Sequence, residues 1–307
     1  MNDLIQWGLA VVLWVQTFRN PLFDQFFLTI NFLGDEEFYL MFLPVVFWCL
    51  HKTLGMRMGV LFLLSFYANQ WLKDLFTAPR PHQVSDKLYA PVKYSGYGIP
   101  SGHAQGTATV WGYLATQLRK PLWWILALGI PLLISVGRMY MGDHFPQDVI
   151  AGLVIGVALV TAYAVLEPRV APWVVAQSLA IKIALVVIVS LALAFLHLTV
   201  DTAVLIGTFL GFYGSVALEE DRLRFDAHAI WWKQLVKLAI GLAVVFGLRL
   251  GLKAIFPVNE WFNLLRYAII GVWIGLGAPW VFVMARLAGH GKREPTAPAQ
   301  IELTPAG

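Results

Sequence analysis

A cation, an imidazole and a carboxylate stand close together at Arg138, His144 and Asp148, in a chain that is otherwise strongly apolar. Pro146 suits the first turn of a helix, because its missing N–H costs nothing there, so a helix is predicted to begin near it. Asp148 then lies one turn after His144 and can accept a hydrogen bond from one imidazole nitrogen. That bond would fix the tautomer and leave the other nitrogen free, as a nucleophilic or general-base histidine requires. A pair that merely caps a helix is the alternative interpretation.

Ser101, Gly102 and His103 form a second polar group, immediately before an apolar segment. Ser101 is a natural N-cap, and the N–H groups after it would be the unpaired donors of the first helical turn. Such donors, together with the positive end of the helix dipole, form a phosphate-binding site. His103 at the same rim could donate a proton to a leaving group. Capping alone explains the serine but not the histidine beside it.

Lys73 and Arg80 form a third group, seven residues apart, with Pro79 and Pro81 stiffening the chain around the arginine. An ammonium and a forked guanidinium at this spacing could surround one anion. The alternative is that both are interfacial cations that extend toward water from a membrane helix.

The composition indicates a membrane protein without a metal or nucleic-acid partner. Of the 307 residues, 59% are hydrophobic and 13% are charged, against about 25% charged in an ordinary soluble domain. The single cysteine, Cys49, excludes a disulfide framework and a thiol metal cluster. No carboxylate cluster has metal-ligand spacing, and the basic residues are too scattered for a nucleic-acid patch. We therefore expect no cofactor.

Ten apolar segments predict an all-α, polytopic helical protein embedded in the bilayer. Whether the first of them crosses the membrane is open, and residues 19–27 fit a helix lying in the interface better than a crossing. The segments are 4–18, 38–50, 58–72, 104–118, 122–136, 149–166, 174–198, 203–218, 235–252 and 264–287.

The distribution of Lys and Arg over the loops orients these segments, because cytoplasmic loops carry more of them. If 58–72 runs outward, all three polar groups lie on the extracytoplasmic side, and most other basic residues lie in the cytoplasm. The outer side still carries several cations, which anion binding would explain. They are Lys73, Arg80, Lys87, Lys93 and Arg138.

In order and spacing, the three groups resemble the signature of the type 2 phosphatidic acid phosphatase superfamily, KxxxxxxRP, PSGH and RxxxxxHxxxD. The resemblance covers 73–148, and a six-helix pattern extends it from the N-terminus to about 166. Residues 33–39 resemble the sphingosine-1-phosphate phosphatase branch, which also carries extra C-terminal helices. One departure is Gly137, where the family usually has serine, so one hydrogen bond to phosphate is lost unless a backbone amide replaces it.

The resemblance implies a two-step mechanism through a phosphohistidine. His144 would attack phosphorus while Asp148 orients it, and His103 would protonate the leaving oxygen and then activate water. Three fixed cations suit phosphoryl transfer, which needs mostly positioning and charge neutralisation. The groups that would hold the phosphate oxygens are Lys73, Arg80, Ser101, Gly102 and Arg138.

The same reading divides the chain into a membrane-embedded phosphatase core at 1–169, additional C-terminal transmembrane helices at 170–288, and a disordered cytoplasmic tail at 289–307. Three roles are open for the four extra helices: widening a lateral opening for a lipid tail, forming a homodimer, or binding a second substrate. The spacing of Gly271 and Gly275 allows close helix packing, which favours a structural or oligomeric role.

The expected function is hydrolysis of a lipid phosphate, a long-chain or sphingoid-base monoester or a phosphatidate, at the extracytoplasmic face of a bacterial inner membrane. A headgroup reaches the helix ends that bear His103 and His144 while its tail stays in the bilayer. Alternatives in the same fold are an isoprenyl diphosphate phosphatase and a lipid phosphotransferase. Another is a non-catalytic phospholipid-binding or transport protein, although binding alone needs the cations and not the histidines.

Overall fold

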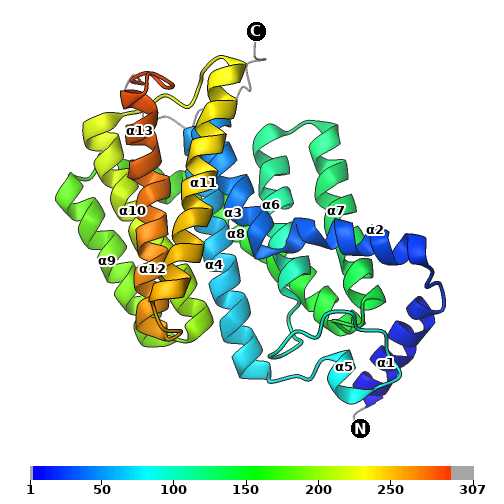
Figure 1. Ribbon diagram of the computed structural model, residues 1–307. Helices are drawn as coiled ribbons and strands as arrows, with labels where there is room; N and C mark the ends of the chain where they lie inside the picture. The colour runs from blue at the N-terminus through cyan, green and yellow to red at the C-terminus, as the bar shows by residue number, and fades with distance from the viewer. Residues whose placement is uncertain (1–2, 292–307) are drawn as a thin grey trace. The chain divides into compact units, whose positions relative to one another are not determined.

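The computed structural model describes residues 3–291, and within this range the chain folds into helices joined by turns (Figure 1). The all-α prediction is confirmed. The elements are α1 (Asp3–Gln16), α2 (Pro21–Asn31), η1 (Phe32–Gly34), α3 (Glu36–Val45), η2 (Val46–Leu50), α4 (Lys52–Phe76), α5 (Pro81–Val84), α6 (Gly102–Leu118), α7 (Pro121–Tyr140), α8 (Pro146–Ala176), α9 (Leu179–Leu196), α10 (Val200–Leu218), η3 (Glu219–Leu223), α11 (Trp231–Ile255), α12 (Glu260–Val272), η4 (Trp273–Gly277) and α13 (Ala278–Met284).

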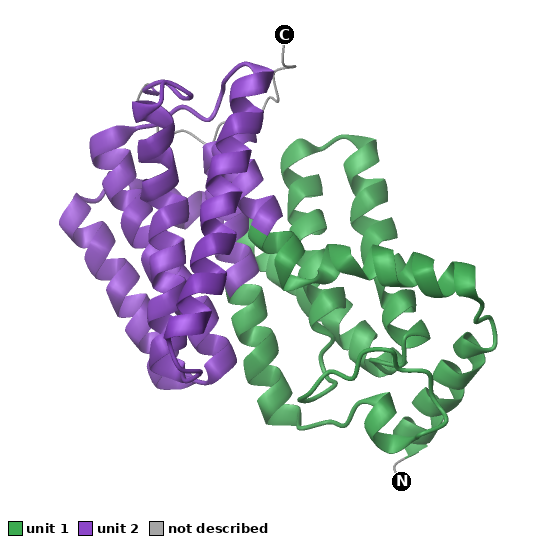
Figure 2. Ribbon diagram, viewed as in Figure 1, with its two compact units in different colours: residues 1–40, 64–165 green, residues 41–63, 166–307 purple. Residues whose placement is uncertain are grey.

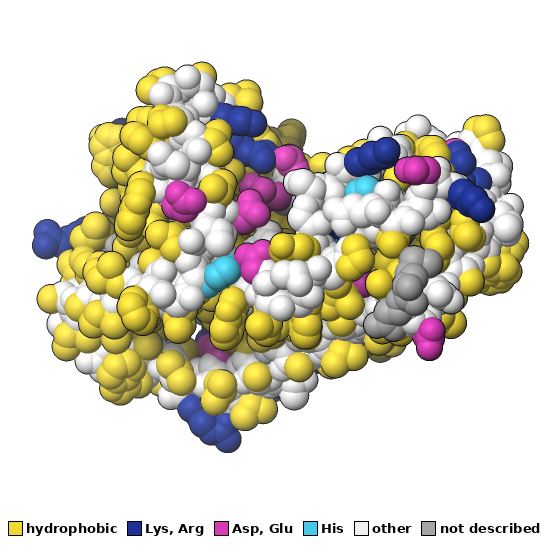
Figure 3. Space-filling view, turned by 90° about the horizontal axis from the view of Figure 1, so that it is seen from below, with side chains coloured by type: hydrophobic (Ala, Val, Ile, Leu, Met, Phe, Trp, Pro, Cys, Tyr) yellow, Lys and Arg dark blue, Asp and Glu magenta, His cyan; other side chains and the backbone are white. Residues whose placement is uncertain are grey.

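Six helical stretches of the described chain are long and apolar enough to cross a membrane, and the protein is an integral membrane protein. Hydrophobic side chains also spread over the face shown in Figure 3, where charged side chains form small separate groups. The count of ten membrane segments stays a prediction. The six stretches are Pro121–Tyr140, Pro146–Ala176, Leu179–Leu196, Val200–Leu223, Trp231–Ile255 and Glu260–Met284.

The chain forms two compact units that do not follow the sequence order (Figure 2). The first unit contains the residues up to 40 together with 64–165, and the second contains 41–63 together with the residues from 166 on. The domain division at 169 and 288 stays a prediction. The predicted tail, 289–307, lies outside the described residues from position 292 onward.

A buried polar chain joins α4 to α6 in the first unit. The Gln105 side chain donates from Nε2 to the Ser65 carbonyl at 2.7 Å and accepts from Asn69 Nδ2 at 2.8 Å. Because these groups are satisfied by one another, their burial is not penalised, and they fix the rotation of α4 against α6. Lys73 follows Asn69 by one helical turn. The buried hydrogen bonds between α4 and α6 therefore set the position of Lys73 beside the start of α6.

Two glycines let α8 approach α6 closely in the same unit. A Cβ built on Gly152 would lie 2.6 Å from the Ser101 carbonyl oxygen, and one on Gly156 would lie 2.8 Å from the Gln105 carbonyl oxygen. No side chain fits between these backbones. The close approach brings the N-terminal ends of α6 and α8, with their histidines, together.

The second unit is held by buried polar side chains and by closely packed glycines. Trp48 donates from Nε1 to the Ile274 carbonyl at 2.9 Å, and Lys237 donates to the carbonyls of Trp48 and Ala227, each at 2.8 Å. These bonds tie residues 46–50, far away in sequence, to the C-terminal helices.

The predicted close packing at Gly271 and Gly275 occurs within the chain. Built Cβ atoms on these glycines would lie 2.6 Å from the Phe212 nitrogen and 2.8 Å from the Phe212 carbonyl oxygen, respectively. The two glycines therefore let α12 and η4 pack against α10.

Candidate active site

The first unit brings the three predicted groups together around His144. His144 lies in the turn between α7 and α8 and is 2% exposed. Its Nδ1 lies 3.4 Å from Asp148 Oδ2, and the same carboxylate oxygen accepts from the Phe145 N–H at 2.9 Å. The predicted pairing of a histidine with an aspartate one turn later is therefore present, with the carboxylate fixed from two sides.

The contact of His144 with Arg80 determines the tautomer. Arg80 Nη1 lies 3.2 Å from His144 Nε2. A guanidinium can only donate, so Nε2 must be the accepting nitrogen and the ring proton must lie on Nδ1, facing Asp148. Nε2 therefore carries a lone pair directed toward a cation, in the place where a phosphate bound to Arg80 would lie.

Burial lowers the pKa of His144 well below its usual value, and the cations of Arg80, Arg138 and Lys73 lower it further. Desolvation and like charges both disfavour the imidazolium. The ring is therefore neutral, as a nucleophile must be, over a range that extends into mildly acidic pH.

We expect the Arg80→Met variant to move the acid limb of the pH–rate profile toward neutral pH. Arg80 opposes protonation of His144, so its loss raises the pKa of the imidazole, and the nucleophile is then lost at higher pH. The measurement is kcat/KM against pH for a substrate whose own titration is known. The matched control is Lys120→Met, because Lys120 is an exposed cation of the same unit, just before α7. An acid limb unchanged in Arg80→Met would contradict this account of His144.

His103, at the start of α6, is the second histidine of the site and is held in place by Asp35. Its Nε2 is 2.8 Å from Asp35 Oδ1 and 3.3 Å from Arg138 Nη1. A single nitrogen cannot donate to the carboxylate and accept from the guanidinium at once, and the shorter contact indicates that Nε2 donates to Asp35. Asp35, which directly follows η1, therefore pairs with the second histidine of the site.

Gly34 leaves the space that the His103 ring occupies. A Cβ on Gly34 would lie 3.0 Å from His103 Cγ and still closer to Cδ2. Any side chain at this position would displace the imidazole.

The buried cations converge on the same place. Arg80 and Arg138 are 5% and 3% exposed, and Arg80 Nη1 also donates to the Asp143 carbonyl at 3.3 Å. Lys73 Nζ lies 3.8 Å from the Cβ position of Gly102. Three positive charges thus border the amide end of α6, which is the arrangement expected for a bound phosphate.

Ser101 occupies the predicted N-cap position but does not cap through its side chain. Its backbone N–H donates to the Asp148 carbonyl at 2.9 Å, which links α6 to α8. The hydroxyl is buried and has no hydrogen-bond partner within the described part of the chain. Ser101 therefore holds the predicted N-cap position without a side-chain capping bond, and its unpaired hydroxyl suits a phosphate oxygen.

Two residues of the site were missed in the sequence. Asp143 is 2% exposed and pairs with Arg138 at 3.1 Å. Burial raises its pKa to about 6, so Arg138 loses this counter-charge below that pH. Asp143 precedes His144 directly, and this position beside a histidine was the only signal of it in the sequence.

Tyr94 is the other missed residue. Its ring centre lies 4.7 Å from Arg138 Cζ and 5.8 Å from Arg80 Cζ, and 6.4 Å from the His103 ring centre. The ring therefore contacts both cations through its π face. It comes from the segment between α5 and α6, where an isolated aromatic residue gives no periodic signal.

At Gly137, the departure from the family pattern has a packing reason. A Cβ there would lie 2.6 Å from Asn31 Oδ1, so α2 packs where a serine side chain would stand. The nearby Ser135 hydroxyl is buried without a hydrogen-bond partner among the described residues.

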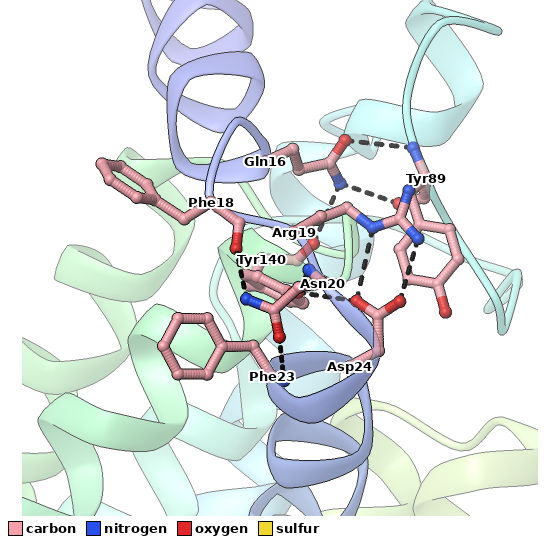
Figure 4. A network of polar contacts seen from close by, with 8 residues as sticks. All are labelled: Gln16, Phe18, Arg19, Asn20, Phe23, Asp24, Tyr89 and Tyr140. Carbon is pink, nitrogen blue, oxygen red and sulfur yellow. Dashed lines mark hydrogen bonds and ion pairs between the residues drawn. The ribbon is translucent and has the colours of Figure 1, made fainter.

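A polar network anchors the turn that carries His144 (Figure 4). Gln16 Nε2 donates to the carbonyls of Tyr89 and Tyr140 at 2.8 and 2.9 Å, and Asp24 accepts from the Tyr140 hydroxyl at 2.6 Å. Arg19 pairs with Asp24 at 3.0 Å and stacks on Tyr89, 3.3 Å from the ring centre. The network fixes the end of α7 and the outer segment to the α1–α2 corner.

We expect Tyr140→Phe to lower the melting temperature by about 2–4 °C, because it removes one hydrogen bond to a charged group. Phosphate release measured well below that temperature should change little, since the hydroxyl belongs to the anchor and not to the site. Thermal unfolding in detergent is the measurement, and Tyr97→Phe is the control because Tyr97 is 37% exposed. Equal melting temperatures for both variants would show that the network does not stabilise the unit.

The chain matches known proteins over both units. A PAP2 superfamily model matches residues 54–172, and a model described as PAP2 superfamily phosphatase, transmembrane extension, matches residues 203–290. Lipid phosphate phosphatase delta of Arabidopsis thaliana is 30% identical over 167 residues, which cover 50% of this chain and 40% of that protein. A probable sphingosine-1-phosphate phosphatase of Dictyostelium discoideum is 28% identical, covering 50% of this chain and 41% of that protein.

One similar solved structure is that of a transmembrane PAP2 type phosphatidylglycerolphosphate phosphatase from Bacillus subtilis. It is 24% identical with a TM-score of 0.49, and the match covers 55% of this chain and 88% of that chain. The matched region of this chain spans less than half the length of the two relatives above.

Proposed function

Because the chain belongs to the PAP2 superfamily, we propose that it is a membrane phosphatase that hydrolyses a lipid phosphate monoester through a phosphohistidine. The observation that carries the proposal is the environment of His144. Its accepting Nε2 faces Arg80, and its Nδ1 faces a buried carboxylate. A binding site for phosphate needs the cations, whereas a neutral imidazole oriented in this way is what a nucleophile needs.

In the first step, the lone pair of His144 Nε2 forms a bond to phosphorus, and the bond from phosphorus to the lipid oxygen breaks. The departing oxygen takes a proton from Nδ1 of His103, which enters this step as an imidazolium whose Nε2 donates to Asp35, so the lipid leaves as an alcohol. The positive charge that develops on the His144 ring is balanced by Asp148, which accepts the Nδ1 proton in a hydrogen bond. Arg80, Arg138 and Lys73 neutralise the phosphoryl oxygens.

In the second step, water attacks the phosphohistidine. His103, now without its proton, takes one from the water, and the bond from phosphorus to Nε2 breaks. Inorganic phosphate leaves and both histidines return to their starting states. The contact of Asp35 with His103 keeps the ring oriented through both transfers.

The substrates proposed first are sphingoid-base and other long-chain phosphates. The names of the two relatives support this class, since one is a lipid phosphate phosphatase and the other a probable sphingosine-1-phosphate phosphatase. We propose that the site faces the extracytoplasmic side of the membrane, because this orientation leaves most remaining Lys and Arg in cytoplasmic loops.

The test is phosphate release by the purified chain in detergent, against sphingosine 1-phosphate, phosphatidate, an isoprenyl diphosphate and one sugar phosphate, with EDTA present. We expect release from a lipid monoester at a rate that EDTA does not change, since three side-chain cations supply the charge. A divalent-metal requirement, or no release from any of the four, would contradict the proposed function. Labelled phosphate appearing on an added lipid alcohol, and not in solution, would identify a transferase.

A further inference from the structure

Arg266 is a buried cation far from the catalytic residues in sequence and outside their compact unit. It lies in α12 of the second unit and is 5% exposed. Its Nε and Nη2 atoms are buried and have no hydrogen-bond partner among the described residues. No ion pair of the described chain includes this guanidinium.

The position of Arg266 in the helix raises the free-energy cost of leaving its guanidinium without a partner. It is the seventh residue of a helix that continues through η4 and α13 as one membrane-crossing stretch, Glu260–Met284. At 1.5 Å per residue, the arginine lies roughly 9 Å below the start of the helix. Unpaired charges at such positions are expensive and mark sites where another group binds.

Asn263 supplies the complementary atom, one turn earlier on the same face of α12. Its Nδ2 donates to the Val200 carbonyl at 3.1 Å. A carbonyl can only accept, so this bond fixes the amide orientation and identifies the other atom as Oδ1. Asn263 Oδ1 is also buried and has no partner within the described residues.

The two side chains thus offer buried donors and one buried acceptor on neighbouring turns. A carboxylate or a fully ionised phosphate would satisfy the guanidinium but would face Asn263 Oδ1 with another acceptor. A phosphate that carries a hydroxyl satisfies both, because its oxygens accept from the guanidinium and its hydroxyl donates to the amide oxygen. We propose that Arg266 and Asn263 form a second, non-catalytic binding site for a phosphate group that bears a hydroxyl.

Two sources could supply this group, a lipid headgroup with a singly protonated phosphate or free inorganic phosphate. Two probes separate them: octylphosphonate, whose C–P bond resists hydrolysis and whose chain mimics a lipid, and inorganic phosphate. Binding of each to the purified full chain is measured as stoichiometry and Kd at mildly acidic pH, where one oxygen keeps its proton.

Variants separate this site from the catalytic site. We expect two bound probe molecules per wild-type chain, one in Arg266→Met, one in Arg80→Met and none in the double variant. Where residual binding to the second site can be measured, Arg266→Met weakens it at least about tenfold, the usual effect of losing a hydrogen bond to a charged group. Asn263→Leu weakens it less. Arg222→Met is the matched control, since the Arg222 side chain is 79% exposed in the same unit.

The melting temperature without ligand distinguishes a variant that loses the binding site from one that loses a structural contact. An unpaired buried charge destabilises the fold, so Arg266→Met should melt at the same temperature as the wild type or higher. A lower melting temperature would show that the guanidinium has a structural partner and would overturn the proposal. An unchanged stoichiometry in Arg266→Met, or a single bound probe in the wild type that Arg80→Met abolishes, would overturn it as well. Arg80→Met tests the catalytic site independently.

Discussion

Replacing His144 by Gln should reduce phosphate release by roughly 10³-fold or more, because the covalent step has no other nucleophile. The substitution keeps a polar side chain that can still accept from Arg80, so the cations remain in place. KM should therefore change less than kcat. Single-turnover and steady-state phosphate release, each with lipid monoester in detergent, measure the two effects separately.

The matched control is His228→Gln, because His228 is an exposed histidine of the second unit. This variant should keep wild-type activity. A well-folded His144→Gln protein that retains more than about a tenth of wild-type kcat would exclude a phosphohistidine at this position, since loss of a nucleophile leaves only the effects of binding and charge.

Replacing His103 by Gln should have an effect that depends on the leaving group. A general acid contributes about 10²–10⁴-fold when the departing oxygen is strongly basic. The loss should therefore be of this size for a lipid phosphate. For p-nitrophenyl phosphate, whose leaving group needs no proton, the first step should be nearly unaffected.

The second step still needs His103 as a base, so the variant should stall as a phosphorylated enzyme. We expect a burst of one p-nitrophenolate per active chain, followed by slow turnover, as stopped-flow absorbance would record. His144→Gln should give no burst. Equal losses for both substrates without a burst would show that His103 acts on binding and not on proton transfer.

Local patterns in the sequence predicted the contact between His144 and Asp148 and the start of α8 at Pro146 correctly. The spacing of four residues between His144 and Asp148, together with Pro146, is enough to place an imidazole beside a carboxylate on one helical turn. Local patterns do not place Lys73 beside the start of α6. That placement depends on the buried Asn69–Gln105 hydrogen bond between α4 and α6. Only the motif order indicated this placement in advance.

The contacts that the sequence could not predict join residues far apart along the chain. Asp35 meets His103 across 68 positions, and the Tyr94 ring meets Arg138 from a segment without periodicity. Such pairs depend on how helices pack, which propensity does not determine. The same holds for residues 41–63, which join the second unit through Trp48 and Lys237, although they precede the catalytic motifs.

The most direct test of the proposed mechanism is to trap the phosphorylated chain. His103→Gln is mixed with phosphorus-labelled substrate in EDTA, quenched in alkali, where phosphohistidine persists, and digested for mass spectrometry. The mechanism predicts one labelled phosphoryl group per active chain, carried by His144 and lost on acid treatment. Label on another residue, or the absence of label while phosphate is still released, would contradict it.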